Sequence, residues 1–382
     1  MSTVVLPGGE RYTLRAGSGY PPPDGPARSR VAYAAAHVVA DPTGDNVPGA
    51  PAVLDWDATL AFRRHLWRYG LGVAEAMDTA QRGMGLDYPT TRELIRRSAA
   101  QARTVGGRIV AGVGTDHLPP GPVSLAEVRD AYTYQLAAVV DAGAQPVIMC
   151  SRHLAAAARD ADDYLSVYSG LLDQVDRPVV LHWLGPMFDP QLAGYWGSSE
   201  VDSAAETVLT LIKHHTSMVD GVKVSLLDER FEVELRRRLP AGVRLYTGDD
   251  FNYVRLIRGD RYGHSDALLG VFAAIAPAAA AALHALDDGD MDGYEAILGP
   301  TVPLARHLFG APTFYYKTGI VFLAWLAGHQ DHFTMVGGLQ AGRSPVHCAT
   351  LLRLAGAAGL LPDAEVAAAR ARAYFTVAGV SQ

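Results

Sequence analysis

The sequence predicts an α/β fold, a (β/α)8 TIM barrel followed by a C-terminal helical domain. Eight short apolar runs alternate with helical stretches over roughly 250 residues, the usual length of such a barrel. No Gly-x-Gly-x-x-Gly turn follows any of these runs, which favours a closed barrel over a doubly wound open sheet. The part from 285 to 382 shows helical periodicity without a strand pattern, so it forms the expected helical domain.

The strand–helix units follow one another in a regular order. Residues 1–29 are rich in Gly and Pro and are expected to form an arm or short hairpin, so the barrel is expected over 30–284. The expected strands are Arg30–Asp41, Gly72–Met77, Arg108–Val113, Gln145–Cys150, Val179–Trp183, Gly221–Ser225, Val243–Thr247 and Ala267–Phe272. The expected helices are Asp55–Tyr69, Thr91–Thr104, Ser124–Ala142, Asp160–Val175, Val201–His215, Asp228–Leu239, Asp250–Arg258 and an alanine-rich helix after Pro277.

Local signals support several of these boundaries. Thr91, with Glu93 just after it, is interpreted as the N-cap of the second helix. Pro178 precedes the fifth strand, a position where proline is tolerated. Asp250 can serve as a helix cap, which is the simple alternative to a role in a site.

Composition and charge limit the classes of function. A net charge of −7 without a basic block argues against nucleic acid or an anionic membrane as partner. Two cysteines provide no disulfide framework, which fits a reducing cytosol. The apolar segment 318–328 is shorter than the ~20 residues of a membrane span, and no signal peptide is recognisable. We therefore expect a cytoplasmic protein that acts on a small molecule.

One lysine stands out in a chain that otherwise uses arginine. Of the 33 basic residues only Lys213, Lys223 and Lys317 are lysines, and Lys223 lies inside the expected strand Gly221–Ser225. A lysine at a strand end can simply reach solvent. In a barrel interior, however, apolar walls would lower its pKa, and a neutral amine can form a Schiff base with a ketone. Lys317, at the start of a C-terminal helix, is interpreted as structural.

Polar residues gather at the C-terminal ends of the expected strands, where (β/α)8 barrels carry their chemistry. They are His37, Glu75, Asp78, Thr79, Thr115, Asp116, His117, Ser151, Arg152, His153, His182, Ser225, Thr247, Gly248, Asp249 and Asp250. Each could be a helix cap or a solvated loop residue. Together they predict a site around Lys223.

Four segments in collinear order resemble the dihydrodipicolinate synthase / N-acetylneuraminate lyase family of class I aldolases, over about residues 30–360. They are Ile109-Val110-Ala111-Gly112-Val113-Gly114, Val222-Lys223, Leu245-Tyr246-Thr247-Gly248-Asp249-Asp250 and the stretch from Leu268 to Ala276-Pro277. The resemblance implies a lyase in which Lys223 forms the Schiff base without a cofactor. It also implies a homo-oligomer, either a dimer or a tetramer.

Two positions depart from the family pattern and affect the expected substrate. The family's strand-2 carboxylate-binding segment is similar to Met77-Asp78-Thr79-Ala80-Gln81, where Asp78 would repel a pyruvate-like carboxylate. The strand-5 tyrosine that relays protons in the family aligns with His182, which can also shuttle protons. Pro186-Met187-Phe188 stands where some members have an arginine for a second carboxylate.

The expected substrate is therefore a keto acid or a keto-sugar-type compound, with a role in carbohydrate metabolism. A neutral polyol or keto sugar suits Asp78, Asp116, His117, His153 and His182 better than pyruvate does, because hydroxyls need both acceptors and donors. Cleavage, condensation and dehydration (a hydro-lyase reaction) all fit the same lysine chemistry. The expected catalytic residues are Lys223 and His182. The expected substrate-binding residues are Asp78, Thr79, Asp116, His117, His153, Ser225, Gly248 and Asp249.

Two other functions stay open. His37, His117, His153 and His182, with Glu75 and Asp78, could bind Zn²⁺ or Mn²⁺ in a metal-dependent aldolase or isomerase. Alternatively, the barrel could bind a sugar without catalysis. Metal analysis tests the first alternative, and the behaviour of a Lys223→Arg variant tests the second.

Overall fold

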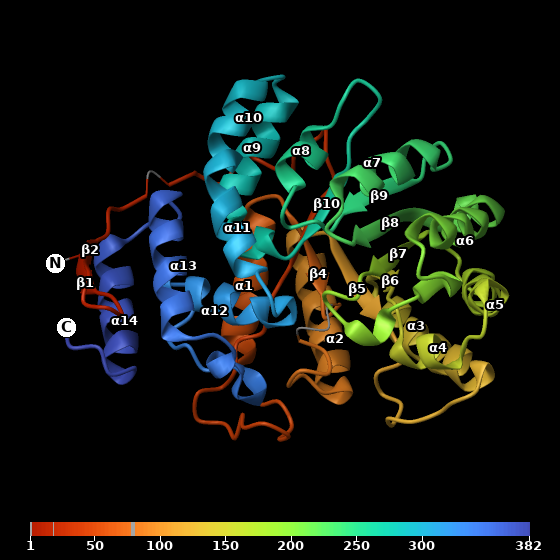
Figure 1. Ribbon diagram of the computed structural model, residues 1–382, viewed down its shortest axis with the longest axis horizontal. Coiled ribbons are helices and arrows are strands. Elements are labelled where there is room, and N and C mark those ends of the chain that lie inside the picture. The colour runs from red at the N-terminus through yellow and green to blue at the C-terminus, as the bar shows by residue number, and fades with distance from the viewer. Residues whose placement is uncertain (1, 18, 78–80) are drawn as a thin grey trace. The chain divides into compact units, whose positions relative to one another are not determined.

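The fold is a closed (β/α)8 barrel with additional helices after it. The computed structural model describes residues 2–17, 19–77 and 81–382. Within them, strands close into a barrel in the order β10-β3-β4-β5-β6-β7-β8-β9, which confirms the predicted fold class. Figure 1 shows β4 to β9 side by side, with α3, α5, α6 and α7 on their outer side.

All the expected barrel strands are present at the predicted places. Their bounds are β3 Ala32–Ala35, β4 Gly72–Glu75, β5 Ile109–Val113, β6 Gln145–Ile148, β7 Val179–Leu184, β8 Val219–Ser225, β9 Arg244–Thr247 and β10 Asp266–Leu269. Every residue of β7 is buried, as expected for a parallel strand covered on both faces. The strand predicted to end at Phe272 ends at Leu269, because Val271–Ala273 turns into a 3-10 helix.

The helices also follow the prediction, with shifted ends. In the barrel they are α1 Trp56–Arg68, α2 Tyr88–Val105, α3 Leu125–Ala142, α4 Arg152–Ala157, α5 Ala161–Leu172, α6 Val201–His214, α7 Glu229–Arg238 and α8 Tyr253–Arg258. The short α4 was not predicted. The later helices are α9 Ala276–Asp287, α10 Met291–Leu298, α11 Val302–Leu308, α12 Tyr316–Leu326, α13 Pro345–Ala357 and α14 Ala364–Val377.

Two helix starts differ from the prediction for a local reason. The predicted N-cap Thr91 is buried inside α2, and the cap is Asp87, whose side chain accepts from the Thr90 N–H. Near α8 the carboxylate of Asp249 accepts from the Phe251 and Asn252 N–H groups, so Asp249, and not the predicted cap Asp250, supports the turn before this helix. A cap of this kind contributes about 1 kcal/mol, and an alternative cap a few residues away is hard to distinguish by sequence.

Short 3-10 segments join many of these elements. They are η1 Pro190–Leu192, η2 Tyr195–Gly197, η3 Thr216–Met218, η4 Val271–Ala273, η5 Gly299–Thr301, η6 Thr313–Tyr315 and η7 Val336–Gly342. Two of them, η1 and η2, lie in the long connection between β7 and α6. This connection carries Asp189, which lines the cavity described below, and Tyr195, whose hydroxyl accepts from the Ser151 N–H at 3.1 Å.

The described chain divides into two compact units. One contains Met1–Leu71, Met84–Leu86 and Gly270–Gln382, and the other contains Gly72–Gly83 and Asp87–Leu269. The predicted boundaries at 29/30 and 284/285 stay predictions. Nearly all of the polar strand ends discussed below belong to the second unit.

The first unit holds the expected N-terminal hairpin and the C-terminal helices. Strands β1 (Thr3–Val5) and β2 (Arg11–Thr13) pair antiparallel. The Gln382 side chain accepts a hydrogen bond from the Val5 N–H through Oε1 and donates one to the Val5 carbonyl through Nε2. Lys317 is 2% exposed and donates from Nζ to the Ala35 carbonyl at 2.6 Å, in line with the structural role predicted for it. Among the described residues, no helix has both the length and the hydropathy that crossing a membrane requires.

Candidate active site

Lys223 lies on β8, between two neighbouring strands of the barrel. Its register partners are His182 on β7 and Tyr246 on β9, and its side chain is 6% exposed. Because side chains alternate along a strand, Lys223 and Ser225 share one face of the sheet. The imidazole Nε2 of His182 lies 3.2 Å from Oγ of Ser225, which places His182 on that same face.

Gly248, just after β9, leaves room for this pair of side chains. A Cβ atom at this position would lie 2.8 Å from Cε of Lys223 and 2.1 Å from Oγ of Ser225. Both distances are well below van der Waals contact. Gly248 was predicted to bind substrate, and the structure gives it a clear spatial role beside the lysine.

Replacing Gly248 with alanine is expected to displace the Lys223 and Ser225 side chains. A displacement of about 1 Å at a reacting group costs on the order of 100-fold in rate. For the predicted Schiff-base role of Lys223, the measurement is the rate at which borohydride traps a carbonyl compound on this lysine. Gly299→Ala is the matched control, because a Cβ there meets nothing within 4 Å. Equal trapping rates in the two variants would contradict the role assigned to Gly248.

His182 is a buried, neutral imidazole beside the lysine. Burial, and then the positive charge of Lys223, lower the pKa of His182 well below its ordinary value. Its Nδ1 is buried and has no hydrogen-bond partner among the described residues. A neutral imidazole carries one N–H and one free lone pair, so His182 can accept or donate a proton next to Lys223.

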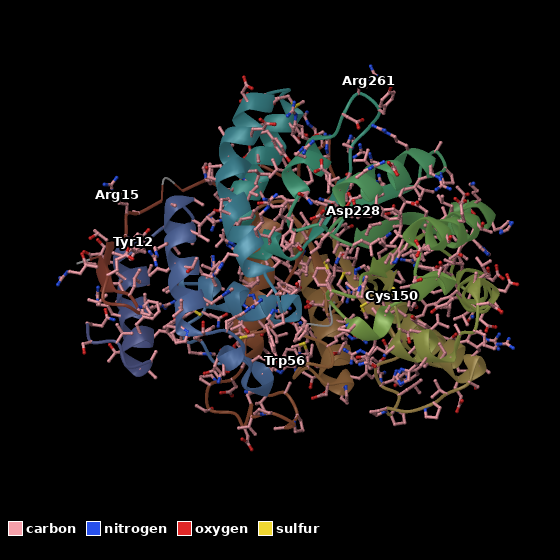
Figure 2. All side chains as sticks on the ribbon, viewed as in Figure 1. Tyr12, Arg15, Trp56, Cys150, Asp228 and Arg261 are labelled. Carbon is pink, nitrogen blue, oxygen red and sulfur yellow. The ribbon has the colours of Figure 1, made fainter. Side chains whose placement is uncertain are left out.

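A cavity of about 620 Å³ opens beside His182. Its polar lining includes Thr115, Ser151, Arg152, His153, His182 and Asp189. Lys223 is not part of the lining and adjoins it through its register partner His182. Cys150, labelled in Figure 2, also lines the cavity, and its thiol donates to the His182 carbonyl at 3.2 Å. Burial raises the pKa of this thiol to about 12, so it is not a thiolate nucleophile.

Backbone strain marks two of the strand ends around the site. Ala76 follows β4 with φ of 47°, and Leu227 follows β8 with φ of 55°. Residues with side chains rarely adopt such angles, and those that do concentrate at functional sites. The Ala76 carbonyl accepts a hydrogen bond from Arg82 at 3.1 Å, so the strained turn is held in place by a buried guanidinium.

Comparison with known proteins identifies the family of the chain. A family model described as "Protein of unknown function (DUF993)" matches residues 7–380. The chain belongs to the DUF993 family. No curated protein matches it.

Solved structures similar to this DUF993 chain are dihydrodipicolinate synthase-type barrels. YagE, a prophage protein of the dihydrodipicolinic acid synthase family from Escherichia coli in complex with pyruvate, is 14% identical, with a TM-score of 0.67 over 87% of this chain and 99% of YagE. The Aquifex aeolicus dihydrodipicolinate synthase is 13% identical, with a TM-score of 0.65 over 87% and 99% of the two chains. The Acinetobacter baumannii enzyme complexed with pyruvate is 15% identical, with a TM-score of 0.64 over 87% and 100%. At these identities the likeness confirms the fold that the resemblance implied.

The predicted substrate ligand Asp116 is bound tightly by its own chain. Arg82 forms a two-pronged ion pair with Asp116, and Gln135 donates to the same carboxylate at 2.9 Å. Burial raises the pKa of the Asp116 carboxyl, but the charge and hydrogen bonds of Arg82 outweigh it and hold that pKa below its ordinary value. Asp116 lines the cavity as an anchored anion.

His117 lies outside the lining of this cavity. Its Nδ1 accepts from Gln135 at 2.8 Å, and its ring packs between Tyr88 and Tyr134 at centroid distances of 5.1 and 5.2 Å. The sequence placed His117 at a strand end but could not reveal these partners from α2 and α3. A substrate contact for His117 stays a prediction.

His153 lines the cavity, but both of its ring nitrogens have partners. Nε2 donates to the Pro119 carbonyl at 3.2 Å, which leaves Nδ1 to accept from the Thr115 hydroxyl at 3.0 Å. Thr115 also lies 2.6 Å from Oγ of Ser151, so the three side chains form one hydrogen-bonded row along the wall.

The remaining predicted residues are placed as follows. Asp78 and Thr79 lie outside the described residues. Asp249 is buried and supports the turn before α8. Burial raises the pKa of its carboxyl, and the hydrogen bonds from Asn252, which lower this pKa, only partly offset the effect. His37 belongs to the other unit, where its Nε2 donates to Gln330 at 2.8 Å. Across residues 2–17, 19–77 and 81–382, no group of three His, Cys, Asp or Glu side chains is arranged to hold a metal ion.

One buried acid near the site was missed by the sequence analysis. Glu232 of α7 is 1% exposed, and its two oxygens accept from Ser265 at 2.8 Å and Thr247 at 2.9 Å. Burial raises the pKa of Glu232 to about 8 despite these hydrogen bonds. Glu232 lies on a strongly charged helix that looks solvent-exposed in the sequence, and only the buried face of α7 reveals its contact with the end of β9.

A second hollow does not resemble a catalytic site. It is a groove of about 970 Å³ along α7 and α8 that includes Asp228, labelled in Figure 2. Arginines in this groove pair with neighbouring carboxylates, as Arg255 does with Glu229 and Arg237 with Asp260. Such exposed pairs contribute little to stability or recognition. The cavity beside His182 is therefore the better candidate site.

Proposed function

We propose that this DUF993 protein is a class I aldolase or lyase that forms a Schiff base through Lys223. The observation that supports this most strongly is a nearly inaccessible lysine on a barrel strand, with a neutral imidazole as its register partner and a cavity beside that imidazole. Two proteins of the same fold, YagE and the Acinetobacter baumannii dihydrodipicolinate synthase, have structures in complex with pyruvate. The proposal requires no cofactor.

The chemistry begins with attack of the Lys223 amine on a ketone carbonyl carbon. The new C–N bond forms as the carbonyl oxygen takes up a proton, and loss of water from the carbinolamine gives an iminium ion. In this proposal His182 donates and accepts these protons, and the support is its register pairing with Lys223 and the 3.2 Å distance from its Nε2 to Oγ of Ser225.

The iminium then accepts the electrons of a neighbouring bond. In an aldol cleavage, His182 removes the proton of the substrate hydroxyl, the carbon–carbon bond breaks, and an aldehyde leaves while the enamine forms on Lys223. Reprotonation of the enamine carbon and hydrolysis release the second product and restore the lysine. In a dehydration the same iminium promotes loss of a proton and a hydroxide. Condensation is the reverse of cleavage.

Borohydride trapping is the direct test of this proposal. Purified protein is incubated with pyruvate, longer keto acids and keto sugars, reduced, digested and analysed by mass spectrometry. The expected result is a reduced adduct on the Lys223 peptide with at least one carbonyl compound. Adducts confined to Lys213, or none with any compound, would overturn the proposal. Preference for pyruvate over every longer compound would contradict the substrate expectation based on Asp78.

The His182 proposal predicts a separation between binding and turnover. His182→Gln is expected to lower turnover by about 10²–10⁴-fold, the usual contribution of a general acid–base, while the trapped adduct on Lys223 still forms. Because the pKa of His182 lies well below its ordinary value, wild-type activity is expected to persist on the acid side of pH 6.5. A variant with unchanged turnover would assign the proton transfers to another group.

Two further properties follow from the same proposal. We infer a cytoplasmic location, because both cysteines, Cys150 and Cys348, are free thiols. We also propose self-association into dimers or tetramers, as in the resembling family. Light scattering of the purified protein measures the assembly state independently of activity.

A further inference from the structure

We propose that Arg152 binds a negatively charged group, a carboxylate or a phosphate, at the end of the substrate remote from its carbonyl. This inference rests on the proposed Schiff-base function and extends it to the class of substrate. In the sequence Arg152 is only one of several polar residues that follow a strand.

The first support is the position of Arg152 and the way it is held. Arg152 lines the same cavity as His182, and its side chain is 47% exposed, whereas His182 is 1% exposed. Its Nε donates to Oδ2 of Asp189 at 2.6 Å. The Asp189 side chain is 2% exposed, and its other oxygen accepts from the Gln191 N–H at 3.2 Å. A buried carboxylate therefore fixes the guanidinium from one side.

The second support is the set of donors that remains. Among the described residues, neither terminal nitrogen of Arg152 has a hydrogen-bond partner, since only its Nε is engaged. Those two nitrogens carry four N–H groups, enough to bind both oxygens of a carboxylate or phosphate. The lysine-based chemistry would take place at the deep end of the site, which leaves the more exposed guanidinium for the far end of the substrate.

Arg82, in the same cavity wall, provides a contrast because its hydrogen-bond donors are engaged within the chain. Its Nε and Nη2 bind Asp116, its Nη1 donates to the carbonyls of Ala76 and Gly112, and Nη2 also donates to Gln135. Every nitrogen of this buried guanidinium is engaged within the chain. Of the two arginines that line the cavity, only Arg152 can offer donors to a ligand without breaking existing contacts.

Among the lining residues that the structure describes, no carboxylate is left without an arginine partner to repel an anionic group. Arg82 is paired with Asp116 and Arg152 with Asp189, so the described lining is close to neutral overall. A planar guanidinium held by a single contact binds carboxylate and phosphate with defined geometry. A purely neutral polyol would gain no charge-assisted hydrogen bond there. The substrate expectation thus shifts from a neutral keto sugar to a keto compound with a distal anion.

The test compares matched substrates in wild-type protein and three variants. The substrates are 2-keto compounds of one chain length that end in a hydroxyl, a carboxylate or a phosphate. Arg152→Gln is expected to lower kcat/KM for the anionic compounds by about 10–100-fold, the range for charged hydrogen bonds, and for the hydroxyl compound by less than about threefold. Arg152→Lys should recover part of the loss. Arg230→Gln, on the exposed face of α7, is the matched control and should equal wild type.

Inorganic phosphate and succinate provide a second readout that does not depend on catalysis. Calorimetric titration of either anion is expected to show one site in wild type and Arg230→Gln, and loss of binding in Arg152→Gln. Equal effects of Arg152→Gln on all three substrates, or anion binding that survives this substitution, would overturn the inference even where the Schiff base forms. Arg152-dependent anion binding without any lysine adduct would overturn the proposed function and leave the anion site standing.

Discussion

Replacing Lys223 with arginine is expected to abolish turnover while leaving the fold in place. Arginine keeps the positive charge and a similar stem, but guanidinium stays protonated and cannot attack a carbonyl. Loss of the nucleophile is expected to cost on the order of 10³-fold or more in kcat, as removal of covalent nucleophiles does elsewhere. The measurements are kcat with the best carbonyl substrate, borohydride trapping, and thermal unfolding.

Lys213→Arg is the matched control for this variant. Lys213 is exposed near the end of α6, so the substitution changes the same chemical group away from the cavity. It should retain full activity and full trapping. Wild-type behaviour of Lys223→Arg in every assay would exclude the Schiff-base mechanism and favour the non-catalytic barrel. A variant that loses activity only because it unfolds would show a lowered melting temperature, and Lys223→Met would then replace it.

The fold could be read from the sequence because its main signal is local. Each barrel strand is a short apolar run between turn signals, and each helix has its own period, so the order of elements follows without knowledge of contacts. The family resemblance assigned a Schiff-base role to Lys223 on the sixth strand, and this role stays a prediction. The errors arose where several local solutions compete, as at the start of α2, where Asp87 and not Thr91 caps the helix.

The site was harder to predict because its polar groups are shared with distant partners. Asp116 and His153 stand at strand ends as expected, yet Arg82, Gln135 and the Pro119 carbonyl already engage them. Only the fold reveals that these groups already have hydrogen-bond partners, because a buried polar group needs a partner and that partner can lie far away along the chain. Arg152 could be singled out only from the structure, for the same reason. Asp189 engages its Nε, and its two terminal nitrogens keep their N–H donors for a ligand.

Acidification is expected to destabilise the unit formed by the N- and C-terminal parts of the chain, through His65 and His329. Their rings lie 4.1 Å apart and pack against Phe62, with Tyr69 also against His65. Burial, then the neighbouring His329 and Arg68, lower the pKa of His65 to about 3, and burial lowers the pKa of His329 to about 4. In the folded protein both rings therefore stay neutral where free histidine takes up a proton.

The sign of the effect follows from these two pKa values. The unfolded chain binds protons near pH 6.5, whereas the folded chain resists them until about pH 4 for His329 and about pH 3 for His65, so stability falls as the pH drops through this window. At pH 5 each histidine is expected to lower the free energy of unfolding by about 1–2 kcal/mol relative to pH 8. The smaller figure allows for the partial exposure of the rings. Urea unfolding at pH 8, 6.5 and 5 measures this loss.

A double variant separates the two histidines from other acid effects. His65→Gln with His329→Gln removes two of the titrating histidines and is expected to reduce the slope of stability against pH between 6.5 and 5, while His37, His182 and His347, whose pKa values are also lowered by burial, keep part of that slope. Carboxylates such as Glu93, whose hydrogen bonds from Arg96 and Arg97 lower its pKa to about 2, lose their stabilising effect only at lower pH. His214→Gln, at the exposed end of α6, should keep the wild-type slope. An unchanged slope in the double variant would show that the acid sensitivity arises from other groups. His37 and His182 would then be replaced next, because burial lowers the pKa of both well below the ordinary value.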